Sequence, residues 1–310
     1  MGSSNLEYLS ESPALQSAVL AKDATVERVA GGFTKFAEGP IWCPEGYLLV
    51  SDIIGDGVWK VFPNGSYAPH RKPSNFANGH TWDLDGNLLT AEHTSRELTR
   101  TTANGLIATV ASHFEGKRFN SPNDVVVRAD GSMYITDPPF GLTPPYSSYE
   151  QEPELDFNGV FRIDGKTGAV TLLSREFKYP NGITFSSDES QLYVNDSANG
   201  QITVFDMRPD GGVTNPRLFA NLSALGSQGV VDGLKVDVAG NVYCTAPGGV
   251  AILDAQGLLL GKIVVPEQPS AVAWGDSDYQ TLYITAETSV YRIRLQLRGT
   301  GSGIRKTTNY

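Results

Sequence analysis

The sequence contains little that would tie the chain to a membrane or to a disulfide framework. Cys43 and Cys244 are its only cysteines. Because both lie in apolar, strand-like runs, we interpret them as buried free thiols rather than a disulfide or a thiolate metal site. No hydrophobic stretch approaches the roughly 20 residues that cross a bilayer, and the N-terminus lacks the basic-then-apolar layout of a secretory signal. These absences predict a cytoplasmic protein with no membrane partner.

Positive charge is also in short supply. The chain has 24 Lys and Arg against 34 Asp and Glu, a formal net charge of -10. This balance argues against nucleic acid or an anionic membrane as the main partner, because both are bound through basic patches. With 40% hydrophobic and 19% charged residues, the 310-residue chain can bury a substantial core. The sequence leaves a monomer or a dimer open.

The main feature that is present is an internal repeat. Each unit has a small or polar residue, a short alternating apolar run, a turn of the Asp-Gly type and a β-rich run, followed by a third run and usually a fourth. Four strands per unit, repeated at roughly 40–58 residues, are typical of β-propeller blades. The six units begin at Phe36, Phe76, Ser121, Tyr179, Val230 and Gln268.

The two ends of the repeat complement each other. The sixth unit stops at 290–295 without a fourth strand, and an unassigned strand-like run at 24–33 precedes the first unit. We therefore predict an all-β fold, a six-bladed β-propeller whose last blade is closed by the N-terminal strand, which removes exposed sheet edges. The expected organisation is an N-terminal extension over 1–22, the propeller over 23–296 and a polar C-terminal tail over 297–310.

One polar residue of each unit is expected to face the central channel, because the innermost strand of each blade lines it. Some of the six residues at this position begin Asn-Gly or Asp-Gly pairs, which turn formation alone would explain. Turn formation does not explain Glu38, because glutamate is a poor turn former. Two carboxylates and several amide carbonyls, with no Cys and no aligned His, are hard oxygen ligands. The set predicts one divalent cation, Ca²⁺ first, with Mg²⁺, Mn²⁺ or Zn²⁺ as alternatives. The aligned residues are Glu38, Asn78, Asn123, Asn181, Asp232 and Ser270.

Further polar side chains are candidates for substrate contact. His80 lies two residues after Asn78 and therefore shares its face of the strand. His93 and Asp137 lie at the ends of second strands, where the alternative is a side chain that binds the turn backbone. The longest loop, 138–158, is rich in Pro and Tyr and is either a flap over the channel mouth or a surface decoration.

The sequence resembles the senescence marker protein 30 / gluconolactonase family over about residues 25–295, through FAEGPIW, RFNSPNDVVV, TDPPFGL, YPNGITFS and VVDGLKVD. It is most similar to the bacterial gluconolactonase-like branch, which shares AEH and SPND…TDPPFGL. The resemblance implies a six-bladed propeller that hydrolyses lactones with a divalent metal. It implies as metal ligands Glu38, Asn123, Asn181 and Asp232, and leaves Asn78 and Ser270 as nearby polar groups of the channel.

The sequence departs from the family at one substrate-binding position. Vertebrate-type members have a substrate-contacting arginine two residues before the Asn123 position, where this chain has Ser121. Arg118 could replace that arginine only if the backbone differs. The sugar specificity of those members therefore does not transfer, and the predicted substrate-binding residues are Asn78, His80, His93, Asp137 and Arg118.

Together these features predict a metal-dependent hydrolase that opens a sugar-type (aldono-)lactone, with a small-molecule lactone as its partner. The lactone carbonyl would be polarised by the metal, and Asp232 would act as general base on a water or as the nucleophile. Two alternatives stay open. One is a phosphotriesterase-like metal-dependent hydrolase, and the other is a non-catalytic propeller in which calcium is structural.

Overall fold

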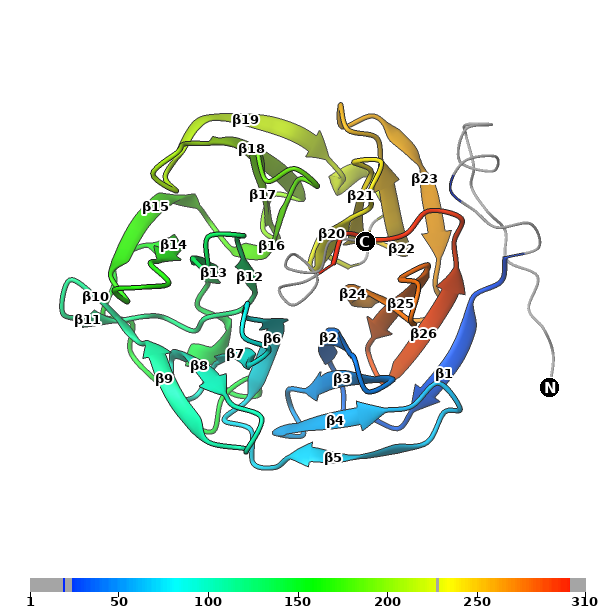
Figure 1. Ribbon diagram of the computed structural model, residues 1–310, viewed down its shortest axis with the longest axis horizontal. Coiled ribbons are helices and arrows are strands. Elements are labelled where there is room, and N and C mark those ends of the chain that lie inside the picture. Colours follow the sequence, from blue (N-terminus) through cyan, green and yellow to red (C-terminus); the bar gives the residue numbers. More distant parts are fainter. Residues whose placement is uncertain (1–18, 20–23, 227–228, 302–310) are drawn as a thin grey trace.

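Six four-stranded antiparallel sheets surround a central channel (Figure 1). The computed structural model describes Val19 and residues 24–226 and 229–301. The strand order confirms the predicted all-β six-bladed propeller. The described residues also include two short 3₁₀ helices, η2 (Phe140–Leu142) and η3 (Ser223–Leu225).

In every blade the innermost strand lies at the channel, as Figure 1 shows for β2, β6, β12, β16, β20 and β24. The first three blades comprise β2 (Ala37–Cys43), β3 (Tyr47–Asp52), β4 (Gly57–Val61) and β5 (Tyr67–Arg71); β6 (Ala77–Trp82), β7 (Leu88–Glu92), β8 (Glu97–Thr101) and β9 (Ile107–Ala111); and β12 (Val125–Val127), β13 (Met133–Asp137), β14 (Asn158–Ile163) and β15 (Val170–Phe177). A two-stranded ribbon, β10 (His113–Phe114) and β11 (Lys117–Arg118), precedes the third blade.

The last three blades follow the same order. They comprise β16 (Pro180–Phe185), β17 (Gln191–Asp196), β18 (Gln201–Met207) and β19 (Val213–Asn221); β20 (Leu234–Val236), β21 (Val242–Ala246), β22 (Gly249–Leu253) and β23 (Leu259–Val264); and β24 (Pro269–Gly275), β25 (Thr281–Ala286), β26 (Ser289–Arg294) and β1 (Glu27–Gly31). No helix in the described ranges is long and apolar enough to cross a membrane.

The ring is closed by its first strand, as predicted. β1 pairs antiparallel with β26, with Glu27 opposite Arg292 and Gly31 opposite Ser289. An ion pair of 2.9 Å between Arg292 Nη2 and Glu27 Oε2 reinforces the register. Because β1 supplies the fourth strand of the sixth blade, the N-terminal and C-terminal parts of the propeller hold each other in place.

Parts of both terminal segments pack on the propeller. Val19, within the predicted N-terminal extension, is 1% exposed and accepts a hydrogen bond of 2.9 Å from the Gln296 amide. The start of the predicted tail runs against the fifth blade, where the Thr300 amide donates to the Val236 carbonyl at 3.0 Å. The rest of the predicted extension, and residues 302–310 of the tail, lie outside the described residues.

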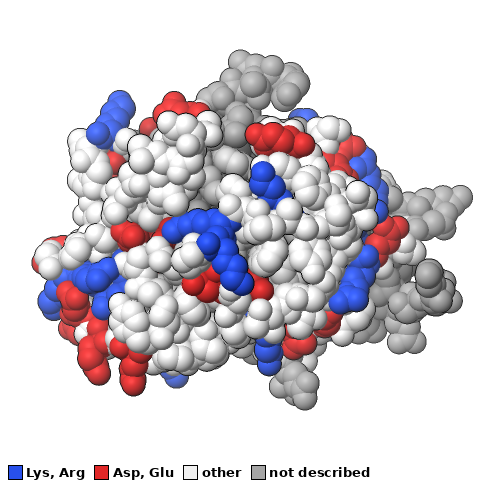
Figure 2. Space-filling view, turned by 90° about the horizontal axis from the view of Figure 1, so that it is seen from below, with Lys and Arg blue, Asp and Glu red and all other residues white. Residues whose placement is uncertain are grey.

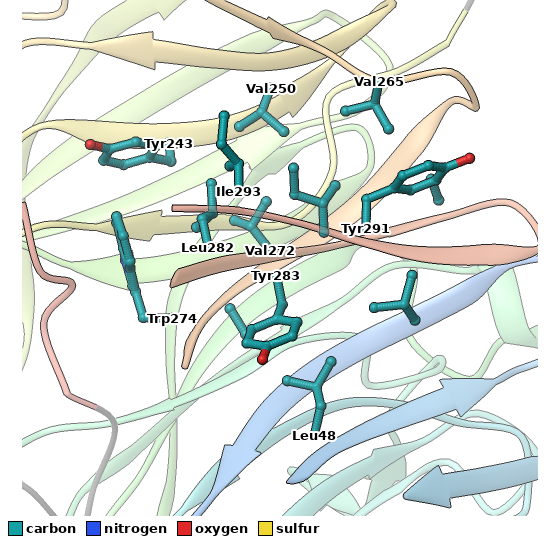
Figure 3. Packing of buried hydrophobic residues seen from close by; sticks show 14 of the residues in the cluster. Leu48, Tyr243, Val250, Val265, Val272, Trp274, Leu282, Tyr283, Tyr291 and Ile293 are labelled. Carbon is teal, nitrogen blue, oxygen red and sulfur yellow. The ribbon is translucent and has the colours of Figure 1, made fainter. Parts of the chain in front are cut away.

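Apolar side chains fill the spaces between neighbouring blades. Between the fifth and sixth blades, Tyr243 meets Trp274 edge to face with ring centroids 5.0 Å apart (Figure 3). Trp42 of the first blade stacks on Tyr283 of the sixth at 5.5 Å. Such aromatic contacts add to the hydrophobic stabilisation of each blade interface. Cys43 and Cys244 are buried free thiols, as predicted.

Charged residues are not gathered by sign on the face drawn in Figure 2. On the face drawn in Figure 2, basic and acidic side chains of the described residues are interspersed among uncharged ones. Among the described residues, charged side chains form local ion pairs, such as Arg294 with Asp278 and Arg217 with Asp206. This face therefore presents no extended basic surface, in keeping with the net charge of -10.

The glycines that follow the polar channel residues allow the innermost strands to approach closely. Gly79 lies within β6 and donates its amide to the Asn123 carbonyl at 2.8 Å. A Cβ on Gly79 would lie 2.6 Å from that same oxygen. The simpler interpretation of Asn78-Gly79 as a turn is therefore wrong. The pair lies at an irregularity of the β6–β7 register, and the glycine is needed for contact between blades.

Gly79→Ala is expected to destabilise the protein by about 2–3 kcal/mol, because the added methyl group meets rigid backbone of the third blade. The free energy of unfolding in urea measures the effect. The matched control is Gly212→Ala, whose Cβ meets only the side-chain ends of Asp210 and Arg208, at 3.0 and 3.6 Å. Equal losses in the two variants would contradict the close-approach explanation.

Candidate active site

Five of the six aligned channel residues line one cavity of about 500 Å³ at the end of the channel where the innermost strands begin. They are Glu38, Asn78, Asn123, Asn181 and Asp232, and each is at most 7% exposed. Ser270 is not among the residues that line it. The structure thus brings together the residues that the sequence placed at equivalent positions of separate blades.

Polar side chains of the preceding blade fix the main chain of these residues. The Thr136 hydroxyl donates to the Asn181 carbonyl at 2.6 Å, and the Asn195 amide donates to the Asp232 carbonyl. The donors occupy the next-to-last position of β13 and β17. The sequence analysis did not identify these donors, although a polar residue occupies the next-to-last position of four second strands, which end in VSD, ITD, VND and CTA. The same contact is made by Ser51 to Asn78 and by Thr245 to Ser270.

Two buried oxygens of the site lack a hydrogen-bond partner among the described residues. Glu38 Oε2 accepts from the Gly39 amide at 2.7 Å, but Glu38 Oε1 has no donor. Asn181 Nδ2 donates to Ser197 Oγ at 2.8 Å, which leaves Asn181 Oδ1 unpaired. Leaving a buried acceptor unsatisfied costs about 1–3 kcal/mol. An arrangement with two such atoms fits a positively charged ligand.

The two carboxylates place strong negative charge in this buried region. Burial is the main cause that raises the pKa of Glu38 to about 7, with the negative charge of Asp124 adding to it. Burial and the neighbouring Glu38 carboxylate raise the pKa of Asp232 well above its usual value. Lys235 offsets part of this effect at Glu38 from the narrower part of the channel. Two carboxylates held together against their charge are typical of a cation site.

The donor set is made of oxygen alone. Within the described part of the chain, no three His, Cys, Asp or Glu side chains form a cluster that could hold a metal by themselves. At this site two carboxylates are joined instead by the amide side chains of Asn123 and Asn181. Carboxylate and amide oxygens are the ligands that Ca²⁺ and other hard divalent cations prefer.

The walls of the cavity are aromatic. Phe36 meets Tyr146 edge to face with centroids 5.3 Å apart, and Phe140 lies 5.3 Å from Tyr179. Ile53 adds a further apolar contact. Apolar walls beside a polar floor lower the local dielectric constant, which strengthens electrostatic interactions between charged groups at the floor.

Two of these aromatic residues, Phe140 and Tyr146, come from the flap, which we define as residues 138–157 between β13 and β14. The flap is fastened to the turn that follows β7. Gln151 Nε2 donates to the Thr94 carbonyl at 3.3 Å, and Arg96 Nη1 donates to the Glu152 carbonyl at 3.2 Å. Since its side chains line the cavity, the flap is part of the site rather than a surface decoration.

Ser121 takes a structural role at the position where the family resemblance led us to look for an arginine. Its hydroxyl donates to the Pro138 carbonyl at 2.6 Å and accepts from the Gly141 amide at 2.9 Å. Ser121 therefore holds the beginning of the flap. Arg118 does not replace the missing arginine: its guanidinium donates to the Ser95 carbonyl and its main-chain amide donates to Glu154, away from the cavity lining.

The remaining candidates divide between cavity and scaffold. His93 lines the cavity. His80 lies in the narrower channel beneath it, between Ser51 Oγ at 2.8 Å and Thr90 Oγ1 at 3.0 Å. The structure does not place Asp137 on the cavity: its Oδ2 accepts from the Asn120 amide at 2.7 Å, the backbone role that was the alternative for a strand-end Asp.

Comparison with known proteins agrees with this architecture. A family model described as the SMP-30/Gluconolactonase/LRE-like region matches residues 36–288. A gluconolactonase of Zymomonas mobilis is 32% identical, with 91% of this chain and 84% of the relative covered. The structure of XC5397, a gluconolactonase from Xanthomonas campestris, is similar with a TM-score of 0.85 and 32% identity, covering 92% of this chain and 93% of that chain. A putative gluconolactonase gives a TM-score of 0.87 at 30% identity, covering 94% and 98%. The chain belongs to the SMP-30/gluconolactonase/LRE-like family.

Proposed function

We propose that this protein is a divalent-metal-dependent lactonase that opens aldonolactone rings. The observation that carries the proposal is the convergence of two carboxylates and two amides on one cavity, with Glu38 Oε1 and Asn181 Oδ1 buried and unpaired. Relatives of similar length are named gluconolactonase, pentonolactonase and L-arabinolactonase. Aldonolactones are therefore the substrates to test first.

Glu38, Asn123, Asn181 and Asp232 would hold one divalent cation. Two carboxylates supply enough charge to neutralise it, and the oxygen-only donor set favours Ca²⁺, with Mg²⁺ and Mn²⁺ next and Zn²⁺ last. When bound, the cation would supply Lewis-acid polarisation of the lactone carbonyl. The two unpaired oxygens would then no longer be unsatisfied.

Asp232 is the residue that acts on the ring. Its carboxylate either takes a proton from the attacking water and passes it to the ring oxygen as the ring C–O bond breaks, or attacks the carbonyl carbon directly. The direct attack breaks the ring C–O bond and forms an anhydride with Asp232, which water then hydrolyses to the hydroxy acid and the free carboxylate. In either case the orientation of the Asp232 carboxylate must be fixed. The Asp232 main chain is held on both sides, because its amide donates to the Thr245 carbonyl at 3.3 Å and its carbonyl accepts from Asn195. Phe36 and Tyr146 give the same cavity apolar walls beside the reacting groups.

The cavity above the ligand ring argues for catalysis over a purely structural ion. A structural site is closed by its own ligands, whereas here about 500 Å³ of space adjoins Glu38 and Asp232. That volume is within the range of small-molecule sites. The size of the cavity, its apolar walls and its reactive floor together favour a bound substrate.

The proposal is tested by the hydrolysis of a panel of lactones, with a phosphotriester as control. The metal-loaded protein should hydrolyse glucono-1,5-lactone or a pentonolactone well above the spontaneous rate, as followed by acid release with a pH indicator. Paraoxon should be turned over at least about a hundredfold less efficiently. Faster phosphotriester hydrolysis would favour the phosphotriesterase alternative, and no turnover of any ester would favour a structural ion.

A further inference from the structure

His93 lies between the flap and the floor of the cavity. It follows β7, is 1% exposed and lines the cavity together with Asn78 and Tyr146. One ring nitrogen, Nδ1, is 3.3 Å from the main-chain carbonyl oxygen of Tyr146 in the flap. The other, Nε2, is 3.3 Å from Nδ2 of Asn78. The imidazole therefore bridges two parts of the site.

These two contacts determine which nitrogen carries the proton. A carbonyl oxygen can only accept a hydrogen bond, so Nδ1 of His93 must be the N–H donor to Tyr146. Burial lowers the pKa of His93 to about 4, so the ring is neutral near pH 7 and Nε2 carries a lone pair. Nε2 must then accept, which means that Asn78 presents its NH₂ group to the ring.

The orientation of Asn78 follows. With its NH₂ group directed at His93, its carbonyl oxygen, Oδ1, points away from the imidazole. In the described part of the chain no hydrogen-bond donor reaches this oxygen, and Asn78 lines the cavity. An oxygen in this position can accept one hydrogen bond from a bound molecule.

The flap holds the imidazole firmly. Gly141 packs on it so closely that a Cβ at Gly141 would lie 2.3 Å from His93 Cβ. The Gly141 amide is bonded in turn to Ser121 Oγ at 2.9 Å. Rotation of the ring would therefore require displacement of the flap, and this restraint extends to the amide of Asn78.

We propose that His93 is a positioning residue that orients Asn78 so that Asn78 Oδ1 accepts a hydrogen bond from a hydroxyl group of the substrate. The inference rests on the proposed lactonase function and assigns the residues that recognise a hydroxyl group of the substrate. A simple lactone offers only acceptor oxygens, whereas a hydroxylated lactone also offers donors. His93 thus selects hydroxylated lactones through Asn78, and its bond to Tyr146 fixes the tautomer in which Nε2 accepts from Asn78.

Two variants separate the two hydrogen bonds of His93. The amide of His93→Asn reaches the position of Nδ1 and retains the bond to the flap, whereas His93→Gln reaches the position of Nε2 and retains an acceptor for Asn78. For glucono-1,5-lactone, kcat/KM should fall about tenfold in His93→Asn and stay within about threefold of the wild type in His93→Gln. For δ-valerolactone, which has no hydroxyl group, both variants should stay within about threefold.

A double-mutant cycle links His93 to Asn78. Asn78→Ala should itself lose about tenfold on glucono-1,5-lactone, and adding His93→Asn should then cost no more than about twofold. Melting temperatures of all variants show whether each is folded. Equal losses on both lactones in the folded variants, or additive losses in the cycle, would mean that His93 has only a structural role.

A second readout does not depend on catalysis. The ¹⁵N NMR shifts of the His93 ring in the substrate-free protein distinguish the Nδ1–H from the Nε2–H tautomer. The Nδ1–H form is expected, and the Nε2–H form would overturn the assigned orientation of Asn78. If the wild type hydrolyses no lactone, the proposed function fails, while the NMR result still decides the orientation.

Discussion

Turnover of the preferred lactone is expected to fall about a thousandfold when Asp232 is replaced by asparagine. The substitution preserves the size of the side chain and one ligand oxygen, but an amide can neither take a proton from water nor attack a carbonyl carbon. General-base catalysis alone contributes about 10²–10⁴ in rate. The measurement is kcat at saturating substrate and metal, so that weaker binding of either one does not change the comparison with the wild type.

The control for this variant is Asp130→Asn. Asp130 lies in the exposed turn between β12 and β13, where its side chain accepts a hydrogen bond from the Ser132 amide. Its substitution should leave kcat within about twofold. If Asp232→Asn kept more than about a tenth of wild-type turnover, Asp232 would be neither base nor nucleophile and the mechanism would be wrong.

Removal of divalent metal is expected to lower lactone turnover by at least about a hundredfold. Without a cation, the Glu38 and Asp232 carboxylates repel each other, and nothing polarises the lactone carbonyl. Turnover should return when Ca²⁺, Mg²⁺, Mn²⁺ or Zn²⁺ is added back separately. We expect Ca²⁺ to restore the most activity, Mg²⁺ and Mn²⁺ less, and Zn²⁺ the least. Full activity of the chelated, dialysed protein would contradict the proposal.

Metal removal should also lower the melting temperature, and more at pH 8 than at pH 5. A cation at a hundred times its Kd stabilises the folded state by about 2.7 kcal/mol. In the metal-free protein, burial raises the pKa of Glu38 from 4.5 to about 7. The folded state therefore keeps a proton that the unfolded state has lost, and the free energy of unfolding falls as the pH rises from about 4.5 to about 7.

Two comparisons separate this effect from general stabilisation by salt. Differential scanning calorimetry at both pH values, with and without the ion, measures the difference in melting temperature. Glu38→Gln should raise the melting temperature of the metal-free protein at pH 8, because it removes one of two buried charges, and should abolish the response to metal. An unchanged response in that variant would exclude Glu38 as a ligand.

The fold and the ring of polar residues were accessible from the sequence because both are repeated. The strand pattern of each blade is local, so six aligned copies reinforce one another, and Glu38, Asn123, Asn181 and Asp232 fall at one position. The same alignment contained a further signal that was not used, the polar residue before the end of the second strand. Thr136 and its counterparts hold the channel residues in place.

The surroundings of the ring were not predictable, because they depend on contacts between blades and with the flap. Ser121 forms hydrogen bonds with Pro138 and Gly141, which are 17 and 20 residues away in the sequence, and no local sequence pattern predicts these contacts. Arg118 is close in sequence to Asn123, yet its side chain bonds to Ser95 in the neighbouring blade. Asn78-Gly79 has the composition of a turn, but it lies within β6, where the approach of the next blade decides its role.

The most direct test of the account is an anomalous difference map from a crystal of the protein soaked in MnCl₂, with Mn²⁺ as the probe. We predict one strong peak in the channel, about 2.1–2.5 Å from side-chain oxygens of Glu38, Asn123, Asn181 and Asp232, and its loss in Asp232→Ala. A peak elsewhere, with none at these four residues, would contradict the claim that they share one cation.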